Sequence, residues 1–158
     1  MNAKLKIRTF YKNDRQAIEE LSGEVFSIYG NYRKYLPEWI DVPDVLTIVA
    51  ELDSLLVGFI VVGIFQEVES SFYADILAIA VHPLFQRQGM GRTLLTEVIS
   101  MIEQQTTLKI KDIRLTVADS NLAGQSLFKK LGFTFSGREG LYEGGQTALR
   151  MSRPLSKL

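Results

Sequence analysis

The feature that most constrains the fold is a change of hydrophobic period across one glycine-containing loop. Phe72–Val81 alternates its side chains as a strand does, and the apolar residues after the loop recur with helical spacing. The helical stripe consists of Leu94, Leu95, Val98, Ile99 and Ile102, and the next strand carries Ile113, Leu115 and Val117. A strand, a helix and a strand in this order form a βαβ unit with parallel strands and the helix on one face of the sheet. The pattern predicts an α/β fold.

Patterns outside this unit predict further elements around it. They indicate a strand at Lys4–Thr9, a helix capped by Asn13 or Asp14, an irregular aromatic stretch ending at Pro37, and a hairpin of Val45–Leu52 with Leu55–Phe65 around Asp53 and Ser54. A second helix should begin at Ser120 or Asn121 and end at Gly132. The last hairpin is predicted from Phe133–Glu139 and Thr147–Ser152.

The composition fits one domain and excludes several kinds of site. A chain of 158 residues has the usual size of a domain, so we expect a single domain over residues 1–158. The 18 basic and 18 acidic residues cancel, which removes the excess positive charge of a general nucleic-acid binder. With no cysteine and one histidine, we expect neither a thiolate nucleophile nor a metal site.

The hydropathy pattern predicts no membrane span. The longest uncharged apolar run, Leu55–Phe65, has 11 residues, whereas a spanning helix needs about 20. The N-terminal segment alternates Lys4, Lys6 and Arg8 with apolar residues, which is not the pattern of a signal peptide. We therefore expect a cytoplasmic protein without a membrane partner.

The loop Gln86–Arg92 has the composition of an anion-binding helix start. Gly89 and Gly91 permit backbone conformations that let successive N–H groups point at one anion. Arg87 and Arg92 add charge suited to a pyrophosphate. The third glycine of a dinucleotide fingerprint and the lysine of a P-loop are both absent. A glycine turn that only enters a basic helix is the alternative.

Two segments resemble the GNAT superfamily of N-acetyltransferases. Gln86–Gly91, preceded by Ile79–Pro83, looks like the loop that binds the pyrophosphate of acyl-CoA there. Asp119–Asn121 and Leu127–Phe133 look like the strand end and the helix that follow it. The resemblance covers about Phe72–Ser152 and looks most similar to the ribosomal-protein N-terminal alanine acetyltransferases. It implies an acetyl-CoA-dependent N-acetyltransferase.

The resemblance also implies a fold and a coenzyme site. The fold would be a mixed, mostly antiparallel sheet of six or seven strands, flanked by about four helices, with one parallel strand pair that splays apart. In this superfamily the pantetheine arm lies in that gap. The coenzyme-binding residues it implies are Ile79, Ala80, Val81, Gln86, Arg87, Gln88, Gly89, Met90, Gly91, Arg92, Thr93, Asn121, Phe128 and Lys130. The Val81 N–H would also donate to the thioester oxygen, on which negative charge develops.

Acyl transfer to an amine needs a base, because an ammonium group has no lone pair for attack. Asp75 lies where several superfamily members carry a glutamate base, and we predict that it acts directly or through a water. Period two would place Asp75 on the strand face of Ile79 and Val81. A solvated surface aspartate is the alternative. Thr116 stands where the N-terminal alanine enzymes use a glutamate, so that route to a base is missing.

Phe128 stands where the superfamily often has a tyrosine that protonates the departing thiolate. A thiolate can leave unprotonated, so phenylalanine does not exclude activity. Tyr142 and Tyr73 are the candidate replacements, and packing or surface tyrosines are the alternative. His82 follows the strand at a proline turn and is interpreted as a solvated loop residue.

Aromatic residues recur between the first predicted helix and the first hairpin. They are Tyr29, Tyr32, Tyr35 and Trp39. On a helix they would form one stripe that packs on the sheet. In the superfamily this segment closes over the acceptor, so Tyr29 and Tyr32, together with Tyr73, are the predicted substrate-binding residues.

Three classes of function follow from these patterns. The leading hypothesis is transfer of an acetyl group from acetyl-CoA to a primary amine, without a metal and without a covalent enzyme intermediate. The second is a non-catalytic acyl-CoA-binding sensor or partner-binding module, which Phe128 and Thr116 favour. The third is a nucleotide-binding α/β domain, which the missing glycine and lysine disfavour. The sequence leaves the acceptor open among a protein N-terminus, a lysine and a small molecule, and leaves a homodimer open.

Overall fold

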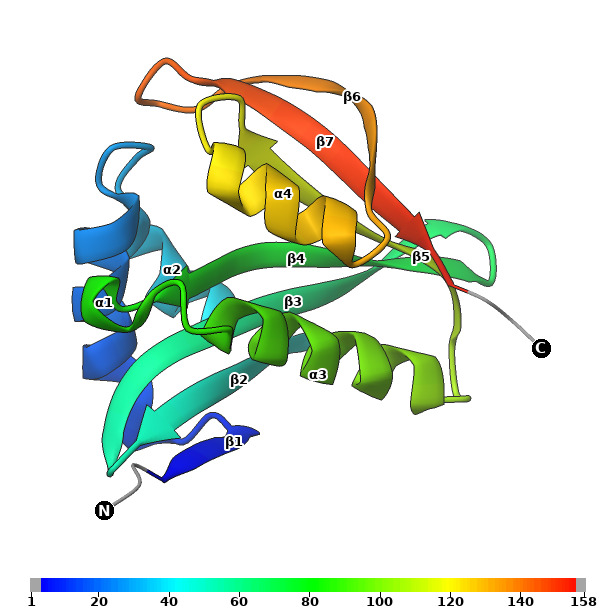
Figure 1. Cartoon of the computed structure of the whole chain (residues 1–158). Helices are drawn as coiled ribbons and strands as arrows, with labels where there is room; N and C mark the ends of the chain where they lie inside the picture. Colours follow the sequence, from blue (N-terminus) through cyan, green and yellow to red (C-terminus); the bar gives the residue numbers. More distant parts are fainter. Residues whose placement is uncertain (1–3, 156–158) are drawn as a thin grey trace.

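A computed structural model describes residues 4–155, which form one seven-stranded sheet with four α-helices on its two faces (Figure 1). The strand order is β1-β2-β3-β4-β5-β7-β6. The strands are β1 (Leu5–Thr9), β2 (Val45–Leu52), β3 (Leu55–Val68), β4 (Ser71–Val81), β5 (Lys109–Ala118), β6 (Thr134–Leu141) and β7 (Thr147–Pro154). The helices are α1 (Arg15–Phe26), α2 (Tyr32–Ile40), α3 (Met90–Gln104) and α4 (Leu122–Lys130), with 3-10 turns η1 (Lys12–Asp14) and η2 (Pro83–Phe85).

The sheet is antiparallel except at one place, where β4 and β5 run parallel. This pair is joined by the crossover through α3, as the change of hydrophobic period predicted. The predicted fold class is confirmed, with seven strands and four α-helices.

The two faces of the sheet are covered unequally. On one face, α3 and α4 pack over a large apolar core that includes Leu94 and Phe133. On the other face, α1 and α2 pack on β2, β3 and β4 through a second core around Ile18, Leu36 and Phe59. Within the described residues no helix covers β5, β7 and β6 on that second face (Figure 1). On the α1/α2 face, the half of the sheet formed by β5, β7 and β6 is therefore not covered by a helix; we call it the open half of this face.

Turn chemistry explains why the hairpins form where the sequence predicted them. Asp53 and Ser54 have φ of 48° and 70° between β2 and β3, and a two-residue turn with positive φ matches the twist of paired strands. At the end of α4, Gly132 has φ of 90°, and the Phe133 N–H donates to Phe128 O at 3.0 Å. A left-handed glycine of this kind ends a helix and satisfies its last carbonyls.

Two predicted boundaries are wrong. Pro37 does not end the aromatic stretch but lies inside α2. Its missing N–H removes one helical bond, and the burial of Leu36, which is 0% exposed, outweighs that loss. Likewise α3 begins at Met90 rather than after Gly91, because Gly89 takes the N-cap position.

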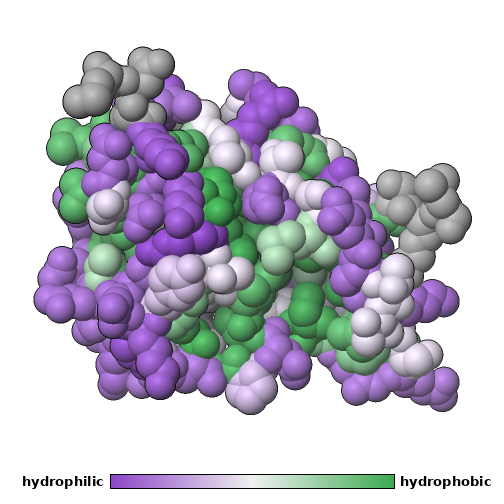
Figure 2. Space-filling view, turned by 90° about the horizontal axis from the view of Figure 1, so that it is seen from below, coloured by the Kyte–Doolittle hydropathy of each residue, from purple (hydrophilic) through white to green (hydrophobic). Residues whose placement is uncertain are grey.

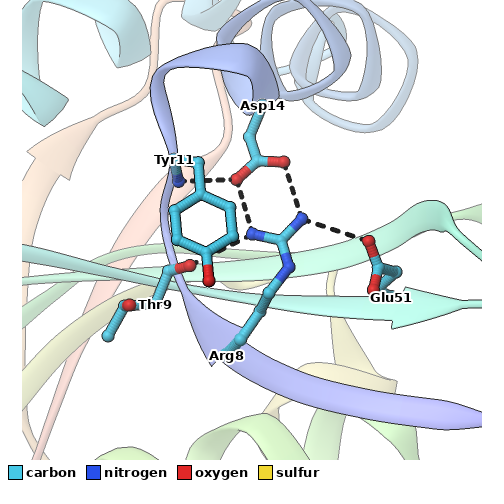
Figure 3. A network of polar contacts seen from close by, with 5 residues as sticks. All are labelled: Arg8, Thr9, Tyr11, Asp14 and Glu51. Atoms are coloured by element: carbon cyan, nitrogen blue, oxygen red, sulfur yellow. Dashed lines mark hydrogen bonds and ion pairs between the residues drawn. The ribbon is translucent and has the colours of Figure 1, made fainter.

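Asp14 lies at the start of α1 as predicted, but its carboxylate does not cap that helix. It accepts hydrogen bonds from Arg8 Nη1 and Nη2 at 2.7 and 2.9 Å and from the Tyr11 N–H at 2.7 Å (Figure 3). Arg8 also donates to Glu51 on β2 at 3.3 Å. The Arg8 guanidinium holds the pKa of Asp14 below its ordinary value. This Arg8 network ties β1 and β2 to the start of α1.

Seen from below, hydrophilic side chains surround a hollowed strip of apolar ones in the middle of the face (Figure 2). Smaller apolar patches also lie near the edges of this face (Figure 2). In the part of the chain that the structure describes, none of the helices is long and apolar enough to cross a bilayer.

Candidate functional site

The parallel strands β4 and β5 pair over only part of their length. Their ladder runs from Ser71 opposite Lys109 to Ile76 opposite Leu115, and the strands separate beyond it. A cleft of about 550 Å³, part of it open to solvent, lies in the gap. Its lining comes from Phe26, Tyr29, Tyr32, Ile76, Leu77, Ala78, Ile79, Leu115, Thr116, Val117, Ala118, Asn121, Phe128 and Tyr142. The predicted splayed pair is therefore present.

A β-bulge in β4 lies at the point where the cleft begins. Leu77 is an extra residue in the pairing of β4 with β3. Ile76 and Ile79 both contact the apolar core under α3 and α4, here called the α3-side core. They are three positions apart, whereas in an unbroken strand only residues an even number of positions apart share a face. Asp75 therefore lies on the α1/α2 face, opposite to Ile79 and Val81. The prediction that these residues share one face is wrong, because the bulge interrupts the period of two.

The open edge of β4 offers backbone groups to the gap. The His82 N–H donates to Val57 O in β3 at 2.8 Å. Because backbone groups alternate sides along a strand, those of Ala80 also face β3, and those of Ile79 and Val81 face the gap. Gln86 Nε2 donates to Val81 O at 2.9 Å, so the side chain of Gln86 holds the carbonyl. The Val81 N–H is left as a donor on the open edge.

The glycine-containing loop ends in an unpaired helix N-terminus. Arg87 and Gly89 have φ of 63° and 82°, in the left-handed region, which makes successive N–H groups converge. The first helical bond runs from the Thr93 N–H to Gly89 O at 3.0 Å. The N–H groups of Met90, Gly91 and Arg92 precede it and have no helical partner, and the first turn carries no acidic residue.

The loop side chains divide into exposed and buried ones. Gln86, Arg87, Gln88, Arg92 and Thr93 are exposed, whereas the side chain of Met90 lies in the α3-side core. Only the backbone of Met90 is therefore available at the loop. None of these loop residues lines the cleft. The exposed arginines and the free N–H groups nevertheless make the start of α3 suited to a phosphate-type anion.

Three further predicted coenzyme residues come from α4 and its start. Asn121 lines the cleft and accepts a hydrogen bond from the Gly124 N–H at 2.9 Å, which makes it the N-cap of α4. Phe128 also lines the cleft and packs edge-on against Phe133 at 6.1 Å. Lys130 is exposed at the end of α4 and does not line the cleft.

Two segments far apart in the sequence meet at the cleft. Tyr142, in the β6–β7 turn, contacts Tyr29 in the α1–α2 loop with 5.3 Å between ring centroids. Tyr35 Oη donates to Glu143 Oε1 at 2.6 Å, and the Gly144 N–H donates to Tyr29 O at 3.1 Å. Burial raises the pKa of Tyr142. The phenol is therefore protonated at the wall of the cleft.

Tyr73 lies outside the cleft lining. Its ring stacks on Phe65 at a centroid distance of 5.6 Å and lies 3.9 Å from the guanidinium carbon of Arg114. His82 is also outside, where its Nδ1 accepts the Leu84 N–H at 3.2 Å and caps η2. The structure brings Tyr29, Tyr32 and Tyr142 together but leaves these two apart from them.

Asp75 lies beside the cleft, one residue before the first lining residue of β4. It is half-buried and pairs across the strands with Arg114 of β5. No side chain or N–H within residues 4–155 donates a hydrogen bond to its carboxylate. Burial raises its pKa to about 6, while nearby Arg150 lowers it and Glu139 raises it. Such a carboxylate is ionised at neutral pH and can still take a proton.

Sequence reasoning missed Glu139. This residue of β6 accepts hydrogen bonds from Arg150 Nη1 at 2.7 Å and from Thr116 Oγ1, which lines the cleft, at 3.2 Å. Thr116 and Glu139 are brought together by β7, which pairs with β5 on one side and with β6 on the other. No spacing in the sequence signals this contact. Within residues 4–155 no three histidine, aspartate or glutamate side chains group as a metal site would need.

Comparisons with known proteins agree with this geometry. The profile of the Acetyltransferase (GNAT) family matches residues 12–133. A curated relative, the ribosomal protein bS18-alanine N-acetyltransferase of Escherichia coli strain K12, is 36% identical over 87 residues. That match covers 52% of this chain and 57% of the relative, so the chain spans little more than half of the length of the curated relative it matches.

Solved structures share the whole fold. The ribosomal-protein-S18-alanine N-acetyltransferase from Escherichia coli superposes with a TM-score of 0.81 at 24% identity, covering 98% of this chain and 96% of that one. NAA60 from Arabidopsis thaliana, in complex with acetyl-CoA, superposes with a TM-score of 0.81 at 17% identity over 96% and 98% of the two chains.

Proposed function

This chain belongs to the acetyltransferase (GNAT) family, and from that premise we propose that it transfers an acetyl group from acetyl-CoA to a primary amine. The amine would attack the thioester directly. The observation that carries the proposal is the gap between β4 and β5, whose open edge leads from the Val81 N–H to the free N–H groups at the start of α3. An extended ligand can join such an edge as an additional strand.

The residues at both ends of the gap fit acetyl-CoA. The backbone groups of Ile79 and Val81 match the amides of a pantetheine arm, which needs partners along its length. The N–H groups of Met90, Gly91 and Arg92, beside Arg87, match a pyrophosphate. The cleft between them is lined mainly by apolar side chains, which suits the carbon chain of the arm.

Asp75 is the proposed base. A protein N-terminus has a reference pKa near 7.7–8.0 and a lysine near 10.4, so the acceptor arrives mostly as an ammonium ion at neutral pH. Asp75 would take one proton from it, directly or through a water. The nitrogen then bonds to the acetyl carbon while the carbon–sulfur bond breaks, and the Val81 N–H stabilises negative charge on the carbonyl oxygen. The second proton of the nitrogen passes to the released CoA thiolate, directly or through water, so that the products are the amide and CoA thiol.

Tyr142 is proposed to donate a hydrogen bond to the departing sulfur. Full proton transfer would be uphill, because burial raises the pKa of Tyr142 above its ordinary value and a thiol has a pKa of about 8.5. A neutral phenol at the cleft wall can nevertheless stabilise a thiolate as a donor. Phe128, which is 5% exposed beside Phe133, offers no such group.

A protein N-terminus is the first acceptor to test. The Escherichia coli relative is named for the alanine of a ribosomal protein. The open half of the α1/α2 face offers room for a chain that approaches the cleft. Tyr29 and Tyr32 lie at the cleft wall and fit the predicted role of acceptor-binding residues.

Release of free CoA thiol from acetyl-CoA tests the proposal. The sequence contains no cysteine, so the protein adds no signal to a thiol-reactive dye. The panel contains an alanine-starting hexapeptide, N-acetyl-capped lysine, spermidine, free amino acids and an aminoglycoside. We expect release that depends on one of these acceptors. Tight CoA binding without release on any acceptor would overturn the transferase and favour the non-catalytic sensor.

A substitution at Gly89 tests the coenzyme site separately. Gly89 has φ of +82°, and a side chain there meets no other atom but strains the backbone. We expect Gly89→Gln to weaken CoA binding at least tenfold by calorimetry. Gly140→Gln is the matched control, since Gly140 has φ of +87° and open space on β6. Equal affinity in both variants would remove the loop from the coenzyme site.

A further inference from the structure

An acceptor that reaches the cleft as an ammonium ion needs a group that receives its charge. The open half of the α1/α2 face carries the side chains that could do so. Thr116 of β5 lies directly opposite Arg150 of β7 in the strand register. Glu139 of β6 lies over this pair, bonded to both side chains through Oε2. The only one of the three that lines the cleft is Thr116.

Glu139 is positioned by these two contacts and is still accessible. Its side chain is 53% exposed and that of Arg150 is 22% exposed. Both donors bind Oε2, and Oε1 accepts no hydrogen bond from any residue between 4 and 155. A carboxylate held at one oxygen and free at the other is arranged to accept a charged N–H donor.

Other residues of the site place Glu139 at the acceptor end of the cleft. Asp75 lies opposite Arg114 in the strand register. Thr116, two residues further along the same face of β5, binds Glu139. The carboxylate therefore lies near the proposed base, and its charge helps to raise the pKa of Asp75. Arg150 already neutralises part of its charge through Oε2. A second cation could bind Oε1, the carboxylate oxygen that has no donor.

We propose that Glu139 binds the ammonium group of the acceptor through Oε1, and that Thr116 and Arg150 position its carboxylate for this contact. The inference rests on the proposed acetyl transfer and specifies its acceptor as a protonated primary amine that enters over β5, β7 and β6. Glu139 holds the ammonium group close to Asp75, and Asp75 then takes one of its protons. It is therefore a substrate-binding residue rather than the base.

Steady-state kinetics of Glu139→Gln tests this role with two probes, the alanine-starting hexapeptide and spermidine. A charge-assisted hydrogen bond is worth enough to change affinity about tenfold or more. We expect the KM for whichever probe the wild type acetylates to rise by that factor. The KM for acetyl-CoA should stay within a factor of two, and kcat should fall less than threefold. Thr116→Val, which removes only the hydroxyl contact, should raise the acceptor KM by about threefold.

Glu103→Gln is the matched control. Glu103 of α3 pairs with Arg153 of β7 at 3.0 Å, an ion pair of the same kind on the opposite face of the sheet. We expect this variant to keep the wild-type KM for both substrates. Rescue is expected from Glu139→Asp, which keeps the charge and should recover part of the acceptor affinity.

The possible outcomes separate this inference from the proposed function. An unchanged acceptor KM in Glu139→Gln, or an equal rise in Glu103→Gln, would overturn it while acetyl transfer stands. A large loss of kcat at unchanged acceptor KM would also overturn it, because that result assigns Glu139 to proton transfer. A wild-type protein that acetylates no acceptor would remove the proposed function and this inference together.

Discussion

Asp14 and Asp75 are two aspartates that lie near arginines of neighbouring strands, and their pKa values move in opposite directions. Arg8 lowers the pKa of Asp14, whereas burial raises that of Asp75 to about 6. Removal from water favours the neutral acid, and hydrogen-bond donors favour the anion. Burial alone therefore does not decide the protonation state of a carboxylate, because the hydrogen-bond donors that reach it can outweigh the loss of hydration.

The donors are distributed very differently at the two sites. Asp14 receives both Nη groups of Arg8 and the Tyr11 N–H (Figure 3). Near Asp75 the arginines are engaged elsewhere, since Arg150 binds Glu139 and Arg114 binds Asp112 and Glu67. The Asp14 site is a satisfied structural network, and Asp75 is left able to exchange a proton.

The largest expected effect is on stability at the satisfied site. Asp14→Asn should lower the free energy of unfolding by about 3 kcal/mol, because it removes the carboxylate that both Nη groups of Arg8 bind and leaves the buried guanidinium only Glu51, at 3.3 Å, as an acidic partner. The two side chains of the broken pair are only 9% and 11% exposed. Urea unfolding followed by circular dichroism measures this loss. Acetyl transfer per folded molecule should stay at the wild-type value. A stable variant would show that the Arg8 network contributes little.

The next effect is on turnover at the unsatisfied site. Asp75→Asn should lower kcat/KM about 100-fold near pH 7, within the usual range for loss of a general base. The wild-type kcat/KM should also fall below about pH 6, where Asp75 becomes protonated. The variant should lose this acid limb and instead gain rate as pH rises toward the pKa of the acceptor amine, because without the base only the free amine can attack. Unchanged rates at every pH would show that Asp75 is not the base.

The pH dependence of stability should have opposite signs at the two sites. The folded-state pKa of Asp75 lies above its unfolded value of 3.8, so the folded state binds more protons. Its contribution is greatest below about pH 4 and is lost as pH rises through 6. Asp75→Asn should therefore gain about 1 kcal/mol over wild type between pH 5 and pH 8, after allowance for solvent screening.

Asp14 supplies the comparison for this experiment. Its folded-state pKa is lowered, so its stabilisation is present above about pH 4 and is lost as pH falls further. The free-energy difference between Asp14→Asn and wild type should shrink on acidification. Unfolding curves at several pH values measure both differences, and parallel slopes for the two variants would break the comparison.

The smallest effect is expected at an exposed pair of the same residue types. Arg15 binds Asp41 through two hydrogen bonds of 2.8 and 2.6 Å, but these side chains are 39% and 62% exposed. Solvent screens such a pair. Asp41→Asn should leave the urea midpoint at the wild-type value within error. A shift as large as that of Asp14→Asn would show that exposure does not separate the two networks.

Much of the fold could be predicted from local patterns. The strand ending at Val81, the Asp53–Ser54 turn and the helix end at Gly132 follow from short-range period and turn chemistry, and the structure confirms them. The prediction that the aromatic stretch ends at Pro37 is wrong, because the burial of Leu36 stabilises α2 despite the proline. Packing of that kind is absent from the local sequence.

The candidate site was predictable to a different degree at its two ends. The loop Gln86–Arg92 is contiguous, so its residue types and order predict an anion-binding helix start, and the structure places the N-terminus of α3 there. The acceptor end is assembled from β4, β5, β6 and two loops. The bulge at Leu77 changed the face of Asp75, and neither this shift nor the Thr116–Glu139 contact follows from spacing.

The order of the elements, the parallel crossover and the position of the glycine-containing loop could be predicted from local patterns, because each depends on residues close in the chain. Tertiary structure decided which carboxylates have donors. Asp14 meets Arg8 from β1, whereas the donors around Asp75 are taken by Glu139 on β6 and by Asp112 and Glu67. Such a competition for hydrogen bonds is settled only when distant strands pair, and it leaves Asp75 free.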